Sequence, residues 1–238
     1  LLPVVYFFRK NDSLLHFVKP VFDRRVFLKT CTNGSSELMT NLSMSLVNAL
    51  YNLQLMKIAG ENGVAAYGAV MYVNFIFVAT FLGYAIGCAP VISYHYGAGN
   101  HAELKNLYKK SMSIILVWGV ILFGAAQLLA PFLSKIFVGY NTGLYAMTLH
   151  GFRVYAIAFL IIGINIFGSS FFTALNNGLI SAVISFLRTL VFQVIMVLTL
   201  PLWFGINGIW SAISIAEALT LIMTTTFFVR QKDKYHYL

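Results

Sequence analysis

Six apolar stretches, each long enough to cross a bilayer, constrain this sequence more than any other feature. They lie near residues 35–58, 64–93, 111–138, 149–175, 181–203 and 206–229. A helical span needs roughly 20 predominantly apolar residues, and a helix satisfies all its backbone hydrogen bonds within hydrocarbon. Only 10% of the 238 residues are charged, against about 25% in soluble domains. The sequence therefore predicts an all-α membrane protein with six transmembrane helices.

The basic residues lie between these stretches and set the expected orientation. The segment 9–30, the connection 94–111 and the tail after residue 229 all carry several Lys or Arg residues. The connections that alternate with these segments along the chain carry no Lys or Arg, and they are 60–63, 139–148 and 204–208. Because cytoplasmic loops are enriched in Lys and Arg, we expect a multi-pass protein of the inner (plasma) membrane with both ends of the chain in the cytoplasm.

The first apolar stretch carries a polar stripe. At 100° per residue, its polar residues fall within an arc of about 80°, and they are Glu37, Asn41, Ser45, Asn48 and Asn52. A carboxylate near mid-bilayer costs about 2.5–3.5 kcal/mol, so this face is expected to meet other helices or water. Hydrogen bonds that hold a bundle together remain one interpretation, and the carboxylate favours the other, a hydrated pathway.

Other polar residues within the spans leave alternatives open. For Glu217, pairing with a nearby cation or hydroxyl and a role in transport are both compatible with the sequence. Arg153 and Arg188, near the starts of the fourth and fifth spans, can both extend to the headgroups, and this interpretation is favoured for Arg188, near the cytoplasmic side. A second stripe on the fourth span favours helix packing, and its members are Asn165, Ser169, Thr173 and Asn176.

Small residues and a proline mark the second span. Gly83 and Gly87 are four residues apart, a spacing that predicts close contact with another helix. Pro90 removes a backbone donor, so a kink is expected near the end of this span.

Catalytic and metal-binding patterns are not apparent. The five histidines are scattered, the two cysteines form no ligand motif, and the Gly-x-Gly at 97–99 follows no predicted strand. We therefore expect neither enzymatic activity nor a metal or cofactor.

Four motifs in order along the chain resemble the multidrug and toxic compound extrusion (MATE) family, and specifically its MepA-like bacterial branch. They are YGAVMYVNFIF, FLGYAIGCAPVISYHYGAGN, GFRVYAIAFLIIGINIFGSSFFTALNNG and ISFLRTLVFQVIMVLTLPLWFGINGIWSAISIAEAL. The resemblance implies one half of a twelve-helix, two-lobe antiporter. Residues 1–8 would then end a preceding transmembrane helix, 9–30 form a cytoplasmic linker between lobes, 31–230 form the six-helix C-terminal lobe and 231–238 form a cytoplasmic tail.

The resemblance also implies a function and a site. It implies export of cationic drugs or metabolites, coupled to proton or sodium influx, with an N-terminal lobe as partner. Nucleic acid is not an expected partner, because the basic residues lie in loops between apolar stretches. Glu37 matches a carboxylate of the family's seventh helix, and Asn41 and Asn48 would complete a cation- or proton-binding site. Glu217 is a secondary candidate. The expected substrate cavity comprises Asn52, Met71, Tyr72, Phe75, Asn165 and Ser169.

Two alternatives from other functional classes remain. One is a flippase for lipids or lipid-linked sugars, whose cavity would present several cations to phosphate groups; Arg153 and Arg188 offer limited support. The other is a membrane scaffold without transport activity, which would apply if a half-length chain is the functional product.

Overall fold

The computed structural model describes residues 22–237, except for the side chains at positions 33, 36, 37, 39 and 40. The chain divides into two compact units, Leu1–Cys31 and Thr32–Leu238. The described residues form helices, which are α2 (Arg24–Gly97), α3 (His101–Val138), α4 (Thr142–Ala156), α5 (Phe159–Ala174), α6 (Gly178–Phe186), the π-helix η1 (Leu187–Phe192), α7 (Gln193–Phe204) and α8 (Ile206–Tyr235). The predicted helix end at 1–8 and most of the predicted linker lie outside the described residues.

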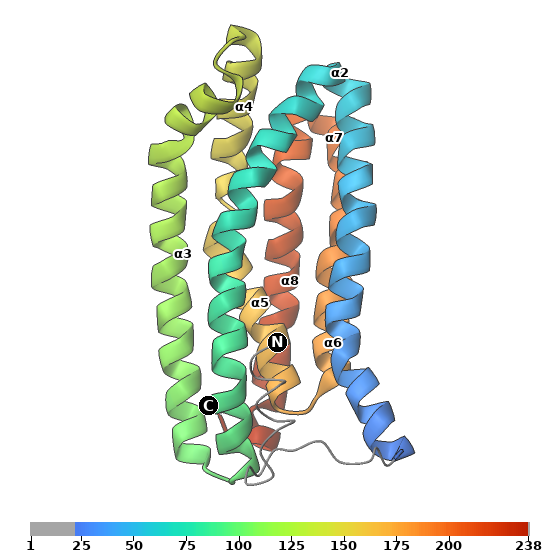
Figure 1. The fold of residues 1–238 in the computed structure, drawn as a ribbon, viewed down its shortest axis with the longest axis vertical. Helices are drawn as coiled ribbons and strands as arrows, with labels where there is room; N and C mark the ends of the chain where they lie inside the picture. The colour runs from blue at the N-terminus through green and yellow to red at the C-terminus, as the bar shows by residue number, and fades with distance from the viewer. Residues whose placement is uncertain (1–21, 238) are drawn as a thin grey trace, which may run out of the picture. The chain divides into compact units, whose positions relative to one another are not determined.

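The helix α2 consists of two helices joined at a kink. Gly60 has φ 62° and ψ −152° in the middle of the element, a conformation that glycine adopts at little cost. Figure 1 shows the two halves of α2 side by side and running in opposite directions, with the reversal at the top of the view. The φ and ψ angles are non-helical at Gly60, and α2 continues through Pro90, where the expected kink stays a prediction.

The helices reproduce the predicted membrane spans. By length and composition, four helices of the described chain can cross a membrane, or five if α4 and α5 are one span bent by 48°. Counting the two halves of α2 separately gives six segments, in the order that the apolar stretches predict. The bend between α4 and α5 falls at residues 157–158, where the sequence contains neither Gly nor Pro.

Asparagines begin three of the helices. Asn100, Asn141 and Asn177 precede α3, α4 and α6, and each side-chain oxygen accepts a hydrogen bond from the backbone N–H three residues later, at 3.1, 3.1 and 3.3 Å. Asparagine is among the best N-cap residues because it satisfies one of the unpaired N–H groups there. These caps, together with the kink at Gly60, set the connections between antiparallel helices.

The core of the second unit is centred on α5. This helix packs against α3, α6 and α8, and the second half of α2 reaches it through Ser170 Oγ, which donates to the carbonyl of Ala85 at 3.2 Å. Aromatic rings fill part of this core, where Phe171 packs against Phe167, Phe172 and Phe228 with centroids 5.5–6.1 Å apart.

Two glycines of α5 permit this packing. A Cβ at Gly163 would overlap the ring of Phe81, and a Cβ at Gly168 would lie 2.5 Å from Thr224 Cγ2. Gly83 and Gly87 face open space within the described chain. The close helix contact predicted at those two residues is therefore absent from the described part, and α5 supplies the close-packing glycines instead.

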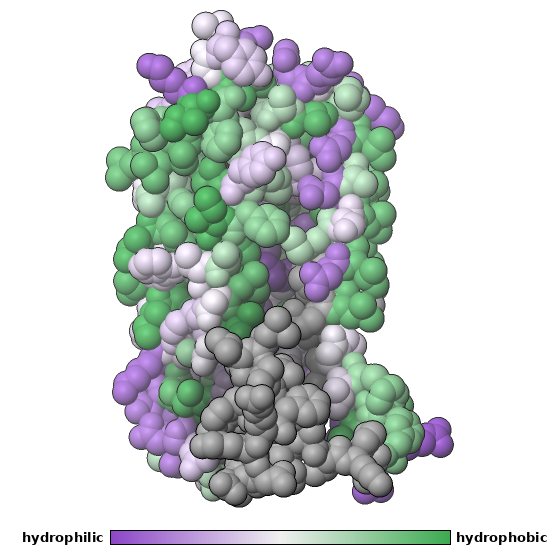
Figure 2. Space-filling view, in the orientation of Figure 1, coloured by the Kyte–Doolittle hydropathy of each residue, from purple (hydrophilic) through white to green (hydrophobic). Residues whose placement is uncertain are grey.

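The charged connections lie at one end of the bundle. The rings of His101, at the start of α3, and His236, just after α8, are 5.0 Å apart, so the basic 94–111 connection and the C-terminal residues share an end. At the start of α8, His150 Nε2 lies 2.8 Å from Asn207 Oδ1. Figure 2 shows apolar residues along both sides of the visible face, with hydrophilic residues gathered toward its ends and others between the two sides. This distribution fits a surface that faces lipid.

Candidate functional site

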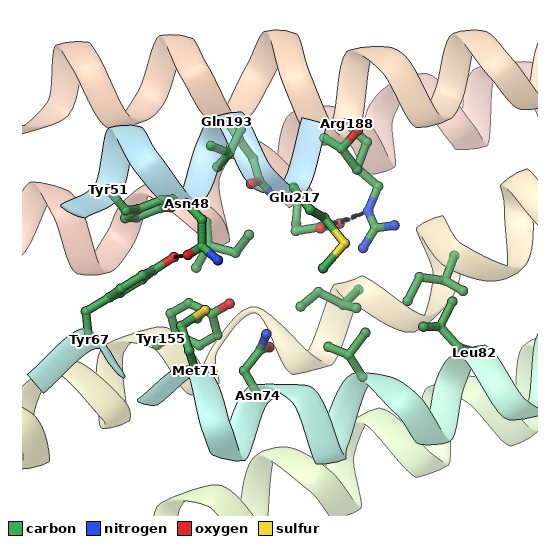
Figure 3. A pocket seen from close by; sticks show the side chains of 17 residues that line it. Asn48, Tyr51, Tyr67, Met71, Asn74, Leu82, Tyr155, Arg188, Gln193 and Glu217 are labelled. Carbon is green, nitrogen blue, oxygen red and sulfur yellow. Dashed lines mark hydrogen bonds and ion pairs between the residues drawn. The ribbon is translucent and has the colours of Figure 1, made fainter. Parts of the chain in front are cut away.

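A cavity of about 150 Å³ lies between the two halves of α2, α4, α5, η1, α7 and α8. Its wall combines apolar side chains with a set of polar ones (Figure 3), which are Asn48, Tyr51, Tyr67, Asn74, Tyr155, Arg188, Thr189, Gln193 and Glu217. These residues come from helices that cross the predicted hydrocarbon layer. Polar groups at such depth cost free energy, and their presence therefore indicates a pathway or a binding site.

The strongest interaction in the wall is an ion pair between η1 and α8. Arg188 Nε donates to Glu217 Oε1 at 2.9 Å and to Oε2 at 3.1 Å, and the two side chains are 14% and 1% exposed. Behind the pair, Asn165 Nδ2 donates to Glu217 Oε2 at 2.7 Å and to the Glu217 carbonyl at 2.9 Å. The carboxylate is therefore held from both sides.

The local backbone at Arg188 is unusual. Residues Leu187–Phe192 form a π-helix between α6 and α7, and π-helical turns in α-helices occur frequently at functional sites. Thr189 Oγ1 donates to the Ser185 carbonyl at 2.6 Å, so this side chain binds the backbone of its own helix. In Figure 3, Arg188 extends from its helix into the cavity, with Glu217 beside its Nε.

A second polar cluster lies on the two halves of α2. The rings of Tyr51 and Tyr67 stack with centroids 4.9 Å apart, and Tyr67 donates its hydroxyl proton to Asn48 Oδ1 at 3.1 Å. The Tyr51 hydroxyl and Asn74 Oδ1 are buried and have no hydrogen-bond partner within the described chain. Since buried polar atoms are nearly always paired, these two atoms indicate a place for water or a ligand.

Three of the predicted site residues lie in this wall, namely Asn48, Met71 and Glu217. Asn165 lies one layer behind, in contact with Glu217. Ser169 is in a cluster of hydroxyls, where its Oγ lies 2.9 Å from Ser181 Oγ and 2.8 Å from Ser185 Oγ. That cluster joins α5 to α6, in keeping with helix packing on this stripe.

The remaining predicted residues lie elsewhere. Asn41 is exposed and Asn52 is half-buried, and neither lines the cavity. Tyr72 and Phe75 are 70% and 67% exposed on the outer face of α2. Glu37 belongs to α2, and its side chain lies outside the described residues.

Sequence reasoning missed several residues of the wall. Arg188 was expected to extend to the headgroups, and the ion pair with Glu217 shows instead that its charged group is retained inside the bundle. The others are Tyr51, Tyr67, Asn74, Tyr155, Thr189 and Gln193. Within the described chain, no group of three or more His, Cys, Asp or Glu side chains lies close enough to hold a metal ion.

Comparison with known proteins gives one family and several similar folds. The MatE family model matches residues 38–199, and no curated protein sequence matches the chain. A crystal structure of MATE in complex with MaL6 superposes with TM-score 0.89 at 20% identity, covering 100% of this chain and 54% of the other. An outward-facing multidrug resistance MATE family transporter of the MOP superfamily gives TM-score 0.86 at 20% identity, with 98% and 53% covered.

A third similar structure is a MOP superfamily transporter from Pyrococcus furiosus, with TM-score 0.86, 20% identity and coverage of 97% and 52%. For that protein, reverse polarity of the binding pocket suggests a different function. The chain thus spans about half the length of the solved structures it matches. At this identity the likeness establishes the fold alone.

Proposed function

Because this chain belongs to the MatE family of membrane transporters, we propose that it forms half of a two-lobe antiporter. The complete transporter exports small cationic or amphipathic molecules across the plasma membrane, in exchange for protons or sodium ions. The partner of this half is a second lobe of similar size, and the substrate pathway lies between the two. Rocking of one lobe against the other gives alternating access in transporters built from repeats.

The observation that supports this proposal is the polar wall of the cavity inside an otherwise apolar bundle. Arg188, Glu217, Asn74 and Gln193 converge there from four different segments, and two buried polar atoms in the wall have no partner within the described chain. Helix packing alone does not require such a space, because polar groups that hold helices together bind one another.

Of the two acids within the predicted spans, Glu217 is already paired within the described chain. Both oxygens of Glu217 accept hydrogen bonds from Arg188, and one also accepts from Asn165, so Glu217 serves to position Arg188. Glu37 is then the acid proposed to exchange a proton for a cationic substrate. A carboxylate in a partly dehydrated site binds either a proton or an organic cation, and this mutual exclusion couples the two movements.

Transport by the complete protein in proteoliposomes tests the proposal. An imposed proton or sodium gradient is expected to drive ethidium movement, and Glu37→Gln is expected to abolish the driven component. Glu61→Gln is the matched control, because Glu61 is exposed in the connection just after Gly60. Absence of gradient-driven transport in the wild type contradicts the antiporter, whereas full transport by Glu37→Gln removes only the role given to that residue.

A flippase for lipids or lipid-linked sugars is supported by Arg188 in the cavity wall. Arg188 is the only Lys or Arg among the residues that line the described cavity, and Glu217 neutralises it. Arg153 is exposed on α4 and does not line the cavity. One neutralised cation is a poor site for a multiply charged phosphate, so transport of small molecules is the better-supported function. Translocation of a fluorescent lipid in the same proteoliposomes tests the flippase, and inactivity in both assays favours a scaffold.

A further inference from the structure

The guanidinium of Arg188 uses only one of its nitrogens on the protein. Nε makes both contacts with Glu217, and neither Nη has a hydrogen-bond partner among the described residues. Figure 3 shows this end of Arg188 directed into the cavity. Arginine carries five N–H donors in a planar fork, so most of its donors remain available there. The fork matches the two oxygens of a carboxylate.

The charges of the wall restrict what this fork can bind. Apart from tyrosines, the ionisable residues of the cavity wall are Arg188 and Glu217, and their formal charges cancel. A simple cation gains little from such a pair, because the positive charge of Arg188 lies beside Glu217 and repels it. A simple anion at the Arg188 fork adds a second negative charge close to Glu217. A ligand that carries both charges avoids this repulsion.

The rest of the wall supplies partners for the second charge. Asn74 Oδ1 is a buried acceptor, the Tyr51 hydroxyl can accept as well as donate, and neither has a hydrogen-bond partner among the described residues. The stacked rings of Tyr51 and Tyr67 present aromatic faces, to which organic cations are attracted. Tyr51 is 3% exposed and lines the cavity, and its hydroxyl is buried with no hydrogen-bond partner among the described residues.

We propose that this cavity binds the charged end of a zwitterionic amphiphile, with its carboxylate on the free Nη groups of Arg188 and its basic group toward Asn74 and the Tyr51–Tyr67 pair. This inference rests on the proposed transport function and names the substrate class of the same site. A pocket for a whole drug-sized ligand is about 300–1,000 Å³, so a cavity of about 150 Å³ holds one end of the ligand. The remainder extends along the apolar side of the wall.

Two related dyes distinguish a zwitterion from a plain cation. Rhodamine 110 has a xanthylium cation and a free benzoate, and rhodamine 123 is its methyl ester and therefore only a cation. Equilibrium dialysis against the purified complete protein in detergent gives the affinity for each. The wild type is expected to bind rhodamine 110 more tightly, because only the free acid can use the Arg188 fork.

Three variants separate binding from folding. The double variant Arg188→Gln/Glu217→Gln removes both charges together, so neither is left unpaired. It should weaken rhodamine 110 binding about tenfold or more, the value of one charged hydrogen-bonding contact. Binding of rhodamine 123 should change little. Glu217→Gln leaves the arginine uncompensated and should strengthen binding of rhodamine 110 relative to rhodamine 123. Arg153→Gln, an exposed arginine outside the cavity, is the matched control and should leave the ratio unchanged.

The ratio of the two affinities decides the outcome. Parallel changes for both dyes in all variants, or tighter binding of the ester by the wild type, overturn the proposal. Displacement of rhodamine 110 by glycerophosphocholine, at concentrations near the Kd of rhodamine 110, also overturns it, because the site would then recognise a zwitterionic lipid headgroup. Since dialysis needs no gradient, failure here with intact ethidium transport leaves the antiporter standing. If the ratio of the two dye affinities depends on Arg188 but the wild type shows no gradient-driven ethidium transport, the result contradicts the antiporter instead.

Discussion

Breaking the Arg188–Glu217 pair is expected to destabilise the protein by an amount that depends on which partner is removed. Arg188→Met leaves the carboxylate of Glu217, 1% exposed, with Asn165 Nδ2 as its remaining side-chain donor. An uncompensated buried charge costs about 3–5 kcal/mol. Glu217→Gln leaves Arg188 beside a cavity of about 150 Å³, which has room for a few waters at roughly 30 Å³ each. Its cost is therefore smaller, about 1–2 kcal/mol.

Thermal unfolding of the purified protein in one detergent measures this asymmetry. A loss of 1 kcal/mol lowers Tm by about 2–4 °C for 150–250 residues, so Arg188→Met should lower Tm by about 6–20 °C and Glu217→Gln by about 2–8 °C. The double variant Arg188→Met/Glu217→Gln should recover most of the larger loss, because no buried charge remains. Equal losses in the two single variants, or a double variant that loses the sum of both, would refute this reasoning.

Two further predictions concern packing and orientation. Gly163→Ala should destabilise the fold by about 1–3 kcal/mol through overpacking, because the added Cβ meets the Phe81 ring. Gly124→Ala on α3 is the control, because its Cβ meets no atom within 4 Å and should leave Tm unchanged. Equal Tm values for the two variants would contradict the close contact at Gly163. In a cysteine-free background, Asn62→Cys should react with a membrane-impermeant maleimide on intact cells and Lys105→Cys only after permeabilisation, and the reverse pattern would contradict the predicted orientation.

Hydropathy predicted most of the fold, because long helices in hydrocarbon need continuous apolar sequence. The predicted spans at 111–138 and 206–229 lie within α3 and α8, and the predicted connection at 60–63 contains the Gly60 kink. The bend between α4 and α5 could not be predicted from the sequence. No breaker residue stands at 157–158, so tertiary packing rather than local sequence sets that bend.

The candidate site could be predicted from the sequence only in part. With Met71 as reference, 100° per residue places Tyr67, Asn74, Val78 and Leu82 within an arc of about 80°, and all five residues line the cavity. Tyr72 lies about 100° away on the same wheel and is exposed. Choosing residues by this face, rather than by nearness in sequence to Met71, identifies Asn74 and excludes Tyr72.

The pairing of Arg188 with Glu217 also follows from the depth of each residue in the membrane. The predicted fifth span begins at residue 181 on the cytoplasmic side, so at 1.5 Å per residue Arg188 stands about 10.5 Å inside. The predicted sixth span begins at 206 on the opposite side and places Glu217 about 16.5 Å from that surface. In a hydrocarbon layer of about 30 Å, the two Cα levels then differ by only about 3 Å. Opposite charges at one depth on consecutive helices are expected to pair, since each alone costs about 2.5–3.5 kcal/mol there.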